Sequence, residues 1–259
     1  MPRMESYKQG TPSYAELVTP DQQGAKAFYG RLFGWELEDV PLGDAGTYVA
    51  VSKEGDSVAG ISGPLPGMED HPAFWGVYLT VDDVDATTAK VADAGGTVDA
   101  APFDVMDLGR MAAIQDPTGA RVNLWQAGAT IGTIRANEPG TPIWNELITP
   151  DVAAATRFYS EVLGVGFEEM PMDGGPAYTC LVVDGRQVGG VMPPPMEGVP
   201  PHWNVYFNVE SVDDTVTTAT SLGGSVVAPA FDVPGVGRMA VLADPQGGMF
   251  SLMQNPPAE

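Results

Sequence analysis

The sequence predicts an α+β protein made of four βαβββ modules, arranged as two homologous halves in tandem. Three observations support this prediction. The phrase TPSYAELVTPD at 11–21 returns as TPIWNELITPD at 141–151, with seven of eleven residues identical. Each copy opens the same order of one strand-like run, one helical pattern and three further strand-like runs. That order then starts again within each half, so the chain contains it four times.

The repeat extends through most of the chain. Equivalent residues lie 130 positions apart, or 128 positions apart after a two-residue deletion near Leu65. The matches are Phe28-Tyr29 with Phe158-Tyr159, Tyr48 with Tyr178, Trp75 with Trp203, Gly109-Arg110-Met111 with Gly237-Arg238-Met239, and Asp116-Pro117 with Asp244-Pro245. We therefore divide the chain into residues 1–130 and 131–259, joined by a linker around 128–139.

The first module begins with a strand over 14–19 that ends at Pro20. Asp21 can cap the helix that follows, in which the spacing of Ala25, Phe28 and Leu32 marks one buried face, and Gly34 ends it. Gly and Asp turn signals then separate three strands. These three strands are expected near 35–39, 47–52 and 57–62.

The second module repeats this order. A strand over 75–81 leads to a helix from about Val84 to Ala94, which Gly95-Gly96 follows. The remaining strands are expected near 97–103, 110–115 and 121–126, the last two joined by Asp-Pro-Thr-Gly. The second half carries the same two modules.

Length and composition favour a soluble, globular, cytoplasmic protein. The 259 residues give room for two domains, each able to bury its own core. Residues are 44% hydrophobic and 18% charged, unlike disordered chains. No run of 18 apolar residues occurs, and the N-terminus lacks the apolar segment of a signal peptide. A single cysteine, Cys180, excludes an intramolecular disulfide framework.

The net charge of −22 argues against nucleic acid and anionic membranes as partners. There are 34 acidic and 12 basic residues, and no run of Lys or Arg could follow a phosphate backbone. A cationic ligand would be attracted by this charge. The simpler interpretation is an acidic surface that keeps the protein in solution.

Three motifs together resemble the vicinal oxygen chelate superfamily, which includes glyoxalase I, extradiol dioxygenases and bleomycin-resistance proteins. They are the xxFYxxxxG helix after a first strand, the V-D-D-V-D helix start that leads to G-G, and the G-R-M…D-P-x-G hairpin. The resemblance covers about 10–254 and looks closest to tandem glyoxalase-like proteins of high-GC bacteria, some associated with antibiotic biosynthesis. It implies two tandem glyoxalase-like domains, each a half-open barrel around a cavity, and hence two sites.

The metal-dependent members of this superfamily hold an ion with His, Gln or Glu side chains from the first and last strands of each module. The resemblance carries those positions to Tyr14, roughly Gly60, Gly76 and Asn123 in the first half, and to Trp144, roughly Gly190, Asn204 and Ser251 in the second. Neither set is a normal catalytic ligand set, and the two histidines, His71 and His202, are not at equivalent places. We therefore expect no metal and no other cofactor.

Two repeated glutamates are the candidate catalytic carboxylates. If Tyr14 points into the cavity, strand alternation places Glu16 there too, and the same parity places Trp144 and Glu146 in the second cavity. Tyr14 and Trp144 could stack on a planar guest. A carboxylate on a partly apolar wall is either paired or titrates abnormally.

Arg110 and Arg238, in the repeated Gly-Arg-Met, are natural partners for these carboxylates. A buried Glu–Arg pair that only fixes the strand ends is one interpretation, and ligand binding or acid–base chemistry is the other. The further candidate ligand-binding residues, each with a core or solvated role as its alternative, are Trp75, Tyr78, Asn123, Trp203, Asn204, Tyr206 and Ser251.

Three functional hypotheses remain from the sequence. The first is a metal-independent binding protein for an aromatic or polycyclic metabolite, used in antibiotic sequestration or as a biosynthetic accessory. The second is a metal-free isomerase, cyclase, hydrolase or lyase that uses a cavity glutamate as acid or base and an arginine to steady an oxyanion. The third is a structural or regulatory partner whose cavities are filled by side chains. We expect unequal affinities in the two halves, and a monomer rather than a homodimer.

Overall fold

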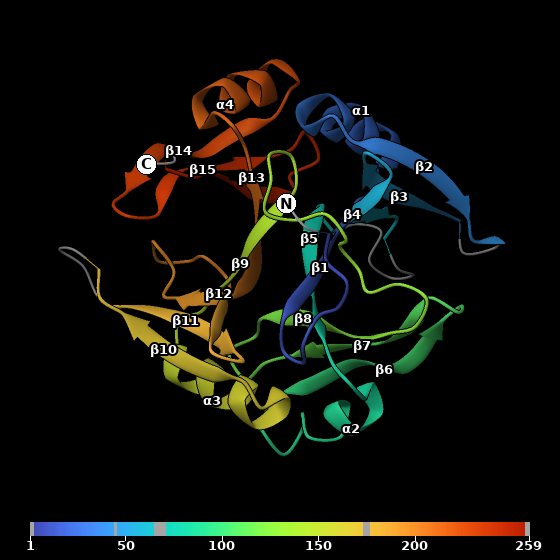
Figure 1. Ribbon diagram of the computed structural model, residues 1–259, viewed down its shortest axis with the longest axis vertical. Coiled ribbons are helices and arrows are strands. Elements are labelled where there is room, and N and C mark those ends of the chain that lie inside the picture. Colours follow the sequence, from blue (N-terminus) through green and yellow to red (C-terminus); the bar gives the residue numbers. More distant parts are fainter. Residues whose placement is uncertain (1–2, 44–45, 65–70, 173–176, 257–259) are drawn as a thin grey trace.

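The computed structural model describes residues 3–43, 46–64, 71–172 and 177–256. It contains two mixed eight-stranded sheets, one from each half, as Figure 1 shows. The first half consists of β1 (Pro12–Val18), α1 (Gln22–Phe33), β2 (Glu36–Pro41), β3 (Thr47–Lys53), β4 (Asp56–Ser62), β5 (Phe74–Thr80), α2 (Val84–Thr88), β6 (Thr97–Val105), β7 (Gly109–Gln115) and β8 (Arg121–Ala127). The second half consists of β9 (Pro142–Ile148), α3 (Val152–Leu163), β10 (Gly166–Met170), β11 (Tyr178–Val183), β12 (Arg186–Met192), β13 (His202–Asn208), α4 (Val212–Ser221), β14 (Ser225–Val233), β15 (Gly237–Ala243) and β16 (Met249–Gln254).

Both sheets have the same topology. The strand orders are β2-β3-β4-β1-β5-β8-β7-β6 and β10-β11-β12-β9-β13-β16-β15-β14. The first strands of the two modules, β1 with β5 and β9 with β13, pair antiparallel at the centre of each sheet. The order of elements confirms the α+β fold with four βαβββ modules in two tandem copies.

The first helix of each half begins and ends where the sequence predicts. The Asp21 carboxylate accepts a hydrogen bond from the Gly24 amide at 2.9 Å, and Gly34 ends α1 in the left-handed conformation, with φ 70°. Asp151 and Gly164 do the same for α3. Within the described ranges, no helix is both long and apolar enough to cross a bilayer.

Helix α2 is shorter than predicted, covering 84–88 instead of about 84–94. Beyond Thr88 the chain continues as turns, in which the Lys90 and Val91 amides donate to carbonyls three residues earlier. The Thr87 hydroxyl also donates back to the Asp83 carbonyl at 2.7 Å. The repeat helix α4 contains more threonines with the same hydroxyl-to-carbonyl bonds and yet stays regular over 212–221, so threonine content alone does not explain the shorter α2.

Each sheet has one face covered by helices and one face free of them. In β1, Ala15 and Leu17 are buried beneath α1, whereas Glu16 lies on the opposite face. Residues directly opposite in an antiparallel pair share a face, so the Glu16–Gly76 pair belongs to the helix-free face and the Leu17–Trp75 pair to the helix-covered face. This alternation positions the candidate site.

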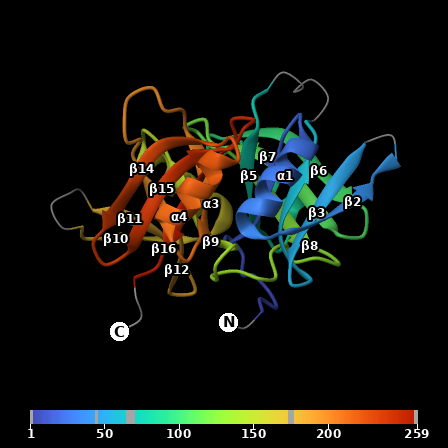
Figure 2. The same ribbon diagram turned by 90° about the horizontal axis from the view of Figure 1, so that it is seen from above.

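The two halves share their cores, although each is long enough to bury one of its own. One apolar cluster joins the first module to the fourth, and a second joins the second module to the third. Accordingly α1 lies beside α4 at one end of the molecule and α2 beside α3 at the other (Figure 1). Figure 2, seen from the α1–α4 end, shows the two halves side by side with these helices near the middle.

A buried hydrogen-bond chain crosses between the halves at each end. The Trp75 indole donates to the Tyr29 hydroxyl at 3.0 Å, and Tyr29 donates to the Asp244 carboxylate of the other half at 2.8 Å. The other Asp244 oxygen accepts the backbone amides of the turn that carries it. The repeat preserves this chain as Trp203 to Tyr159 at 3.0 Å and Tyr159 to Asp116 at 3.2 Å.

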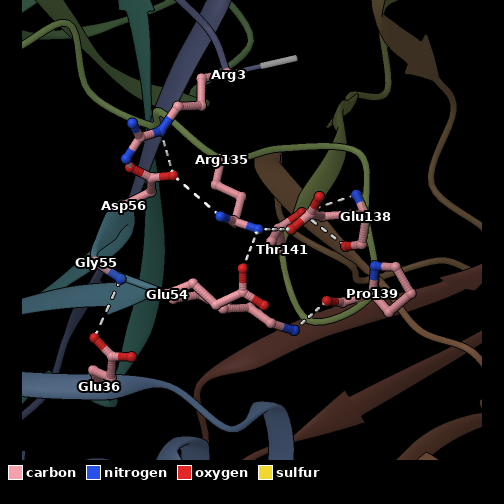
Figure 3. Close-up of polar contacts among 10 residues, drawn as sticks. Arg3, Glu36, Glu54, Gly55, Asp56, Arg135, Glu138, Pro139 and Thr141 are labelled. Atoms are coloured by element: carbon pink, nitrogen blue, oxygen red, sulfur yellow. Dashed lines mark hydrogen bonds and ion pairs between the residues drawn. The ribbon is translucent and has the colours of Figure 1, made fainter. Parts of the chain in front are cut away.

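The linker between the halves is anchored to the first sheet by charge. Asp56, at the start of β4, is only 2% exposed and binds both Arg3 and Arg135, which hold its pKa below the usual range (Figure 3). Arg135 also reaches Glu54 at 2.9 Å and Glu138 at 2.7 Å. The linker is therefore a fixed part of the first half's surface.

We expect Tyr29→Phe to lower the free energy of unfolding by about 1–3 kcal/mol, because it removes the hydroxyl that satisfies the buried Trp75 indole and Asp244 carboxylate. Urea denaturation followed by circular dichroism measures this. Tyr159→Phe is the matched variant in the other half and should cost a similar amount. Stability equal to wild type in both variants would contradict a role for these bonds in joining the halves.

Candidate functional site

The first candidate site centres on Glu16, on the helix-free face of the first sheet. Glu16 lies in the register between Gly60 of β4 and Gly76 of β5, so neither neighbouring strand places a side chain beside it. The Ser62 hydroxyl donates to one Glu16 oxygen at 2.6 Å, and the Tyr78 hydroxyl donates to the other at 3.1 Å. Glu16 remains partly exposed.

Two more tyrosines cover this carboxyl group. The Tyr14 and Tyr48 hydroxyls are 2.7 Å apart, and the Tyr14 and Tyr78 rings meet edge to face at 5.8 Å. A Cβ atom at Gly60 would overlap the Tyr48 hydroxyl. Glycine at this position therefore makes room for the phenol, and the same relation holds between Gly190 and Tyr178.

The second candidate site repeats this arrangement around Glu146, with a tighter enclosure. Tyr178 donates to one Glu146 oxygen at 2.5 Å, and Tyr206 donates to the other at 2.8 Å. The Trp144 indole in turn donates to the Tyr178 hydroxyl at 3.1 Å. Glu146 is only 4% exposed.

Burial dominates the electrostatics of both sites. It raises the pKa of Glu16 and of Glu146, and the hydroxyl donors around each carboxylate oppose this only in part. Burial also raises the pKa of Tyr78 and Tyr206, which keeps these phenols as hydrogen-bond donors. Each site thus presents a carboxyl group that holds its proton to a higher pH than an exposed glutamate.

The expected Glu–Arg pairs are wrong. Arg110 instead binds Asp85 through two nitrogens, at 2.8 and 3.0 Å, and Asp104 at 2.8 Å, all near the surface. Arg238 does the same with Asp213 and Asp232. The two arginines fasten the β6–β7 and β14–β15 hairpins to the start of α2 and α4, where nearby acidic residues were available as partners.

The prediction that Trp75 and Trp203 belong to the ligand-binding sites is also wrong. Both are 5% exposed and lie in the shared cores on the helix-covered faces. The register explains this, because Trp75 pairs with Leu17 and Trp203 with Leu147, which point to the helices. Neither indole can reach the helix-free face.

The other predicted residues are brought together as expected on the helix-free faces. The register places Tyr14 opposite Tyr78 and Tyr78 beside Asn123 in the first half. The corresponding residues around Glu146 in the second half are Trp144, Asn204, Tyr206 and Ser251. Tyr48, Tyr178 and Ser62, which the sequence analysis gave no role, complete the two sites.

A row of apolar side chains on the same faces was missed as well. Phe103 pairs with Met111, and Met111 with Trp125, which meets Tyr78 edge to face at 6.3 Å. In the second half the row is Phe231, Met239 and Met253. Although they are large and apolar, Phe103 and Phe231 remain 45% and 43% exposed. Two surface hollows of about 270 and 280 Å³ lie elsewhere, beside the linker and the β14–β15 hairpin.

The donor set does not fit the metal ion that the superfamily resemblance implies. Each site offers one carboxyl group, whose oxygens already accept hydrogen bonds from hydroxyl groups. Glycine stands on one or both sides of it in the register. Over the described residues, no group of three or more His, Cys, Asp or Glu side chains is arranged so that it could hold a metal ion.

We expect Gly190→Ala to destabilise the protein by about 1–3 kcal/mol, because the new methyl group must displace the Tyr178 hydroxyl from Glu146. Gly166→Ala is a suitable control, since the nearest atom to its new Cβ lies 3.7 Å away. Thermal unfolding of both variants tests this. Equal melting temperatures for the two would show that Tyr178 has room to move.

We expect the stability of the protein to depend on pH through Glu146. Because burial raises its pKa above the ordinary 4.5, the folded state keeps this proton to a higher pH than the unfolded chain. The resulting stabilisation is complete below about pH 4.5 and is lost as pH rises through the folded pKa, at about 1.4 kcal/mol per unit of pKa elevation. Glu146→Gln should therefore flatten the pH profile.

Urea unfolding of wild type and Glu146→Gln between pH 4.5 and 8 measures this difference. Relative to wild type, the variant should gain stability as the pH rises. The exposed Glu197→Gln serves as the control and should follow wild type. Parallel profiles for wild type and Glu146→Gln would contradict a buried carboxyl with a raised pKa.

Known proteins of similar sequence cover the whole chain. The protein named "Putative glyoxylase CFP32" of Mycobacterium tuberculosis is 47% identical over 261 residues, all of both chains. The anthracycline biosynthesis protein DnrV of Streptomyces peucetius is 37% identical over 267 residues, which span 97% of this chain and 95% of DnrV.

Solved structures with the same fold include the 2,3-dioxygenase LapB of Pseudomonas sp. KL28, with a TM-score of 0.66, 18% identity, and coverage of 98% of this chain and 97% of LapB. The Mn(II)-bound glyoxalase of Novosphingobium aromaticivorans has a TM-score of 0.65 and 19% identity over 96% of this chain and 83% of its own. At these identities the structures show the fold alone. The sequence-family model of the Glyoxalase/Bleomycin resistance protein/Dioxygenase superfamily matches residues 11–124 and 142–252. The chain therefore belongs to this superfamily as a tandem, two-domain member.

Proposed function

We propose that this protein binds a planar aromatic or polycyclic metabolite on the helix-free face of its sheets without a metal ion. One observation carries the proposal: a partly or fully buried carboxyl group lies among tyrosine hydroxyls on a face lined by aromatic rings, and no cationic side chain of the described ranges bonds to it. Such a face offers hydrogen bonding at its centre and ring contacts around it.

The apolar row supports a ligand with a large ring surface. Phe103 and Phe231 remain nearly half exposed on the same faces, and apolar side chains at such positions commonly contact a ligand. The net charge of −22 and the carboxyl groups disfavour an anion. The ligand class that fits is a neutral or cationic ring system.

The relatives support a role around secondary metabolites. DnrV and the similar DauV are named anthracycline biosynthesis proteins, and each aligns with nearly the whole chain. An accessory that holds a polycyclic intermediate, or a protein that sequesters an antibiotic, needs a ring-binding face but no catalytic metal. Both roles are consistent with the donor set described above.

A metal-free enzyme is the second candidate, and the raised pKa of Glu16 favours it. A carboxyl group whose pKa is raised by burial can act as a general acid, and its conjugate base can remove a proton from a ligand. Glu16 is partly exposed and so can meet a ligand. Isomerisation, cyclisation or elimination on the ring substituents are the reactions open to such a group.

A titration of the metal-stripped protein with 1,4-dihydroxyanthraquinone, followed by tryptophan fluorescence, tests the binding function. Chemical analysis of the same mixtures for products tests the enzymatic one. We expect saturable quenching and unchanged compound. Conversion of the compound without metal, abolished in Glu16→Gln while affinity changes by less than about tenfold, would establish the enzyme instead. Absence of quenching with this probe and with a panel of planar aromatic antibiotics would refute ligand binding on these faces.

A further inference from the structure

The two halves differ at one position next to the glutamate. In the register, Gly76 lies opposite Glu16 in the first half, and Asn204 lies opposite Glu146 in the second. The Asn204 amide donates to the Ser251 hydroxyl at 2.8 Å and is buried, as is Ser251. The second half therefore places a hydrogen-bonded side chain where the first half has none.

The first half also differs at the residue equivalent to Ser251, which is the hydrogen-bond partner of Asn204 in the second half. Asn123 stands where Ser251 stands in the second half, and within the described part of the chain its side chain amide makes no hydrogen bond. A Cβ atom built on Gly76 would lie 3.4 Å from the Asn123 nitrogen, so this amide borders the position directly. Asn123 is partly exposed.

The rest of the second site is closed by packing. Tyr206, Met239 and Met253 form a buried cluster with Trp144 on the helix-free face, and Glu146 is 4% exposed beneath its two phenols. In the first half, Tyr78 and Trp125 are as buried as Tyr206 and Met253, but Met111, the counterpart of Met239, is only partly buried. The two sites thus have the same arrangement and differ in exposure at Glu16, Met111 and Asn123, which are less buried than Glu146, Met239 and Ser251.

We infer that the first half holds the ligand, over Gly76 and between the Glu16 carboxyl and the Asn123 amide, and that the second half is a closed copy with a structural role. This assignment rests on the proposed function. Glu16 can bond a ring hydroxyl, Asn123 can donate to a ring carbonyl, and Tyr14, Tyr78 and Trp125 contact the rings. The class of ligand is a planar ring system that carries both a hydroxyl and a carbonyl group.

The exchange of one residue between the halves tests the assignment. Gly76→Asn places the second-half residue in the first site, and Asn204→Gly is the matched reverse exchange. With 1,4-dihydroxyanthraquinone as the probe, calorimetry of wild type should give one molecule per chain. Gly76→Asn should weaken binding by about tenfold or more, since the new side chain occupies the ligand position, while Asn204→Gly should leave the affinity of the first site unchanged.

Three further variants and an analogue of the probe keep the test decisive if Gly76→Asn unfolds, which circular dichroism would detect. Asn123→Ala removes no hydrogen bond that the described structure contains, so it should fold, and it should weaken the probe without destabilising the protein. Trp125→Phe should remove most of the fluorescence quenching, and Trp144→Phe should leave it. The dimethoxy analogue of the probe, which cannot donate a hydrogen bond to Glu16, should bind more weakly than the dihydroxy compound.

The outcomes separate this assignment from the proposed function. Two equal sites per chain, or binding that depends on Asn204 and Trp144 and not on Gly76 and Asn123, would overturn the assignment to the first half and leave ligand binding intact. No binding of the probe or of the aromatic panel to wild type would overturn both.

Discussion

The hydrogen bond from Tyr29 to Asp244, repeated as Tyr159 to Asp116, is the interaction on which the arrangement of the molecule depends. Each bond joins a helix of one half to a turn of the other inside a shared apolar core. A buried carboxylate or indole that lost this partner would cost far more than the net worth of one hydrogen bond. The helix-covered faces of both sheets are therefore committed to holding the halves together.

This commitment leaves only the helix-free faces for function. A sheet residue must point to one face or the other, so Leu17 and Trp75 serve the interface while their neighbours Glu16 and Gly76 are available for a ligand. The same strands thus supply the core and the site, with successive residues alternating between the two tasks. Duplication of the module explains why both halves carry the same division.

The order of elements along the chain and the position of the glutamates could be predicted because both follow from local patterns. Alternation in a seven-residue strand is enough to place Glu16 on the face opposite Leu17. The sharing of cores could not be predicted, since all four modules have similar patterns and nothing local says whose helix meets which module. Which modules share a core depends on packing between residues far apart in the sequence.

Other errors came from signals that were present but not used. Parity applied to β5 would have placed Trp75 beside Leu17, and parity applied to β8 would have placed Trp125 with Asn123 on the helix-free face. For Arg110, the acidic partners Asp85 and Asp104 both recur 128 residues later, at the offset of the repeat itself. A search for acidic residues that repeat together with the arginine would have favoured these surface ion pairs over a buried Glu–Arg pair.

A buried or half-buried glutamate without a positive partner is costly, and among the described residues the centre of each sheet carries one, Glu16 or Glu146. The cost is moderated by hydroxyl donors, and it falls further if the carboxyl group is protonated, which a raised pKa favours. In the second half both oxygens are capped by tyrosines and almost no surface remains, so the group can only organise the residues around it. In the first half, the glycine opposite Glu16 leaves space beside the carboxyl group, and the Asn123 side-chain amide makes no hydrogen bond among the described residues. The difference between the halves lies in a few side chains on one face, while the paired cores beneath them stay alike, and this is the pattern expected when one copy of a duplicated site keeps contact with a ligand and the other is retained for the fold.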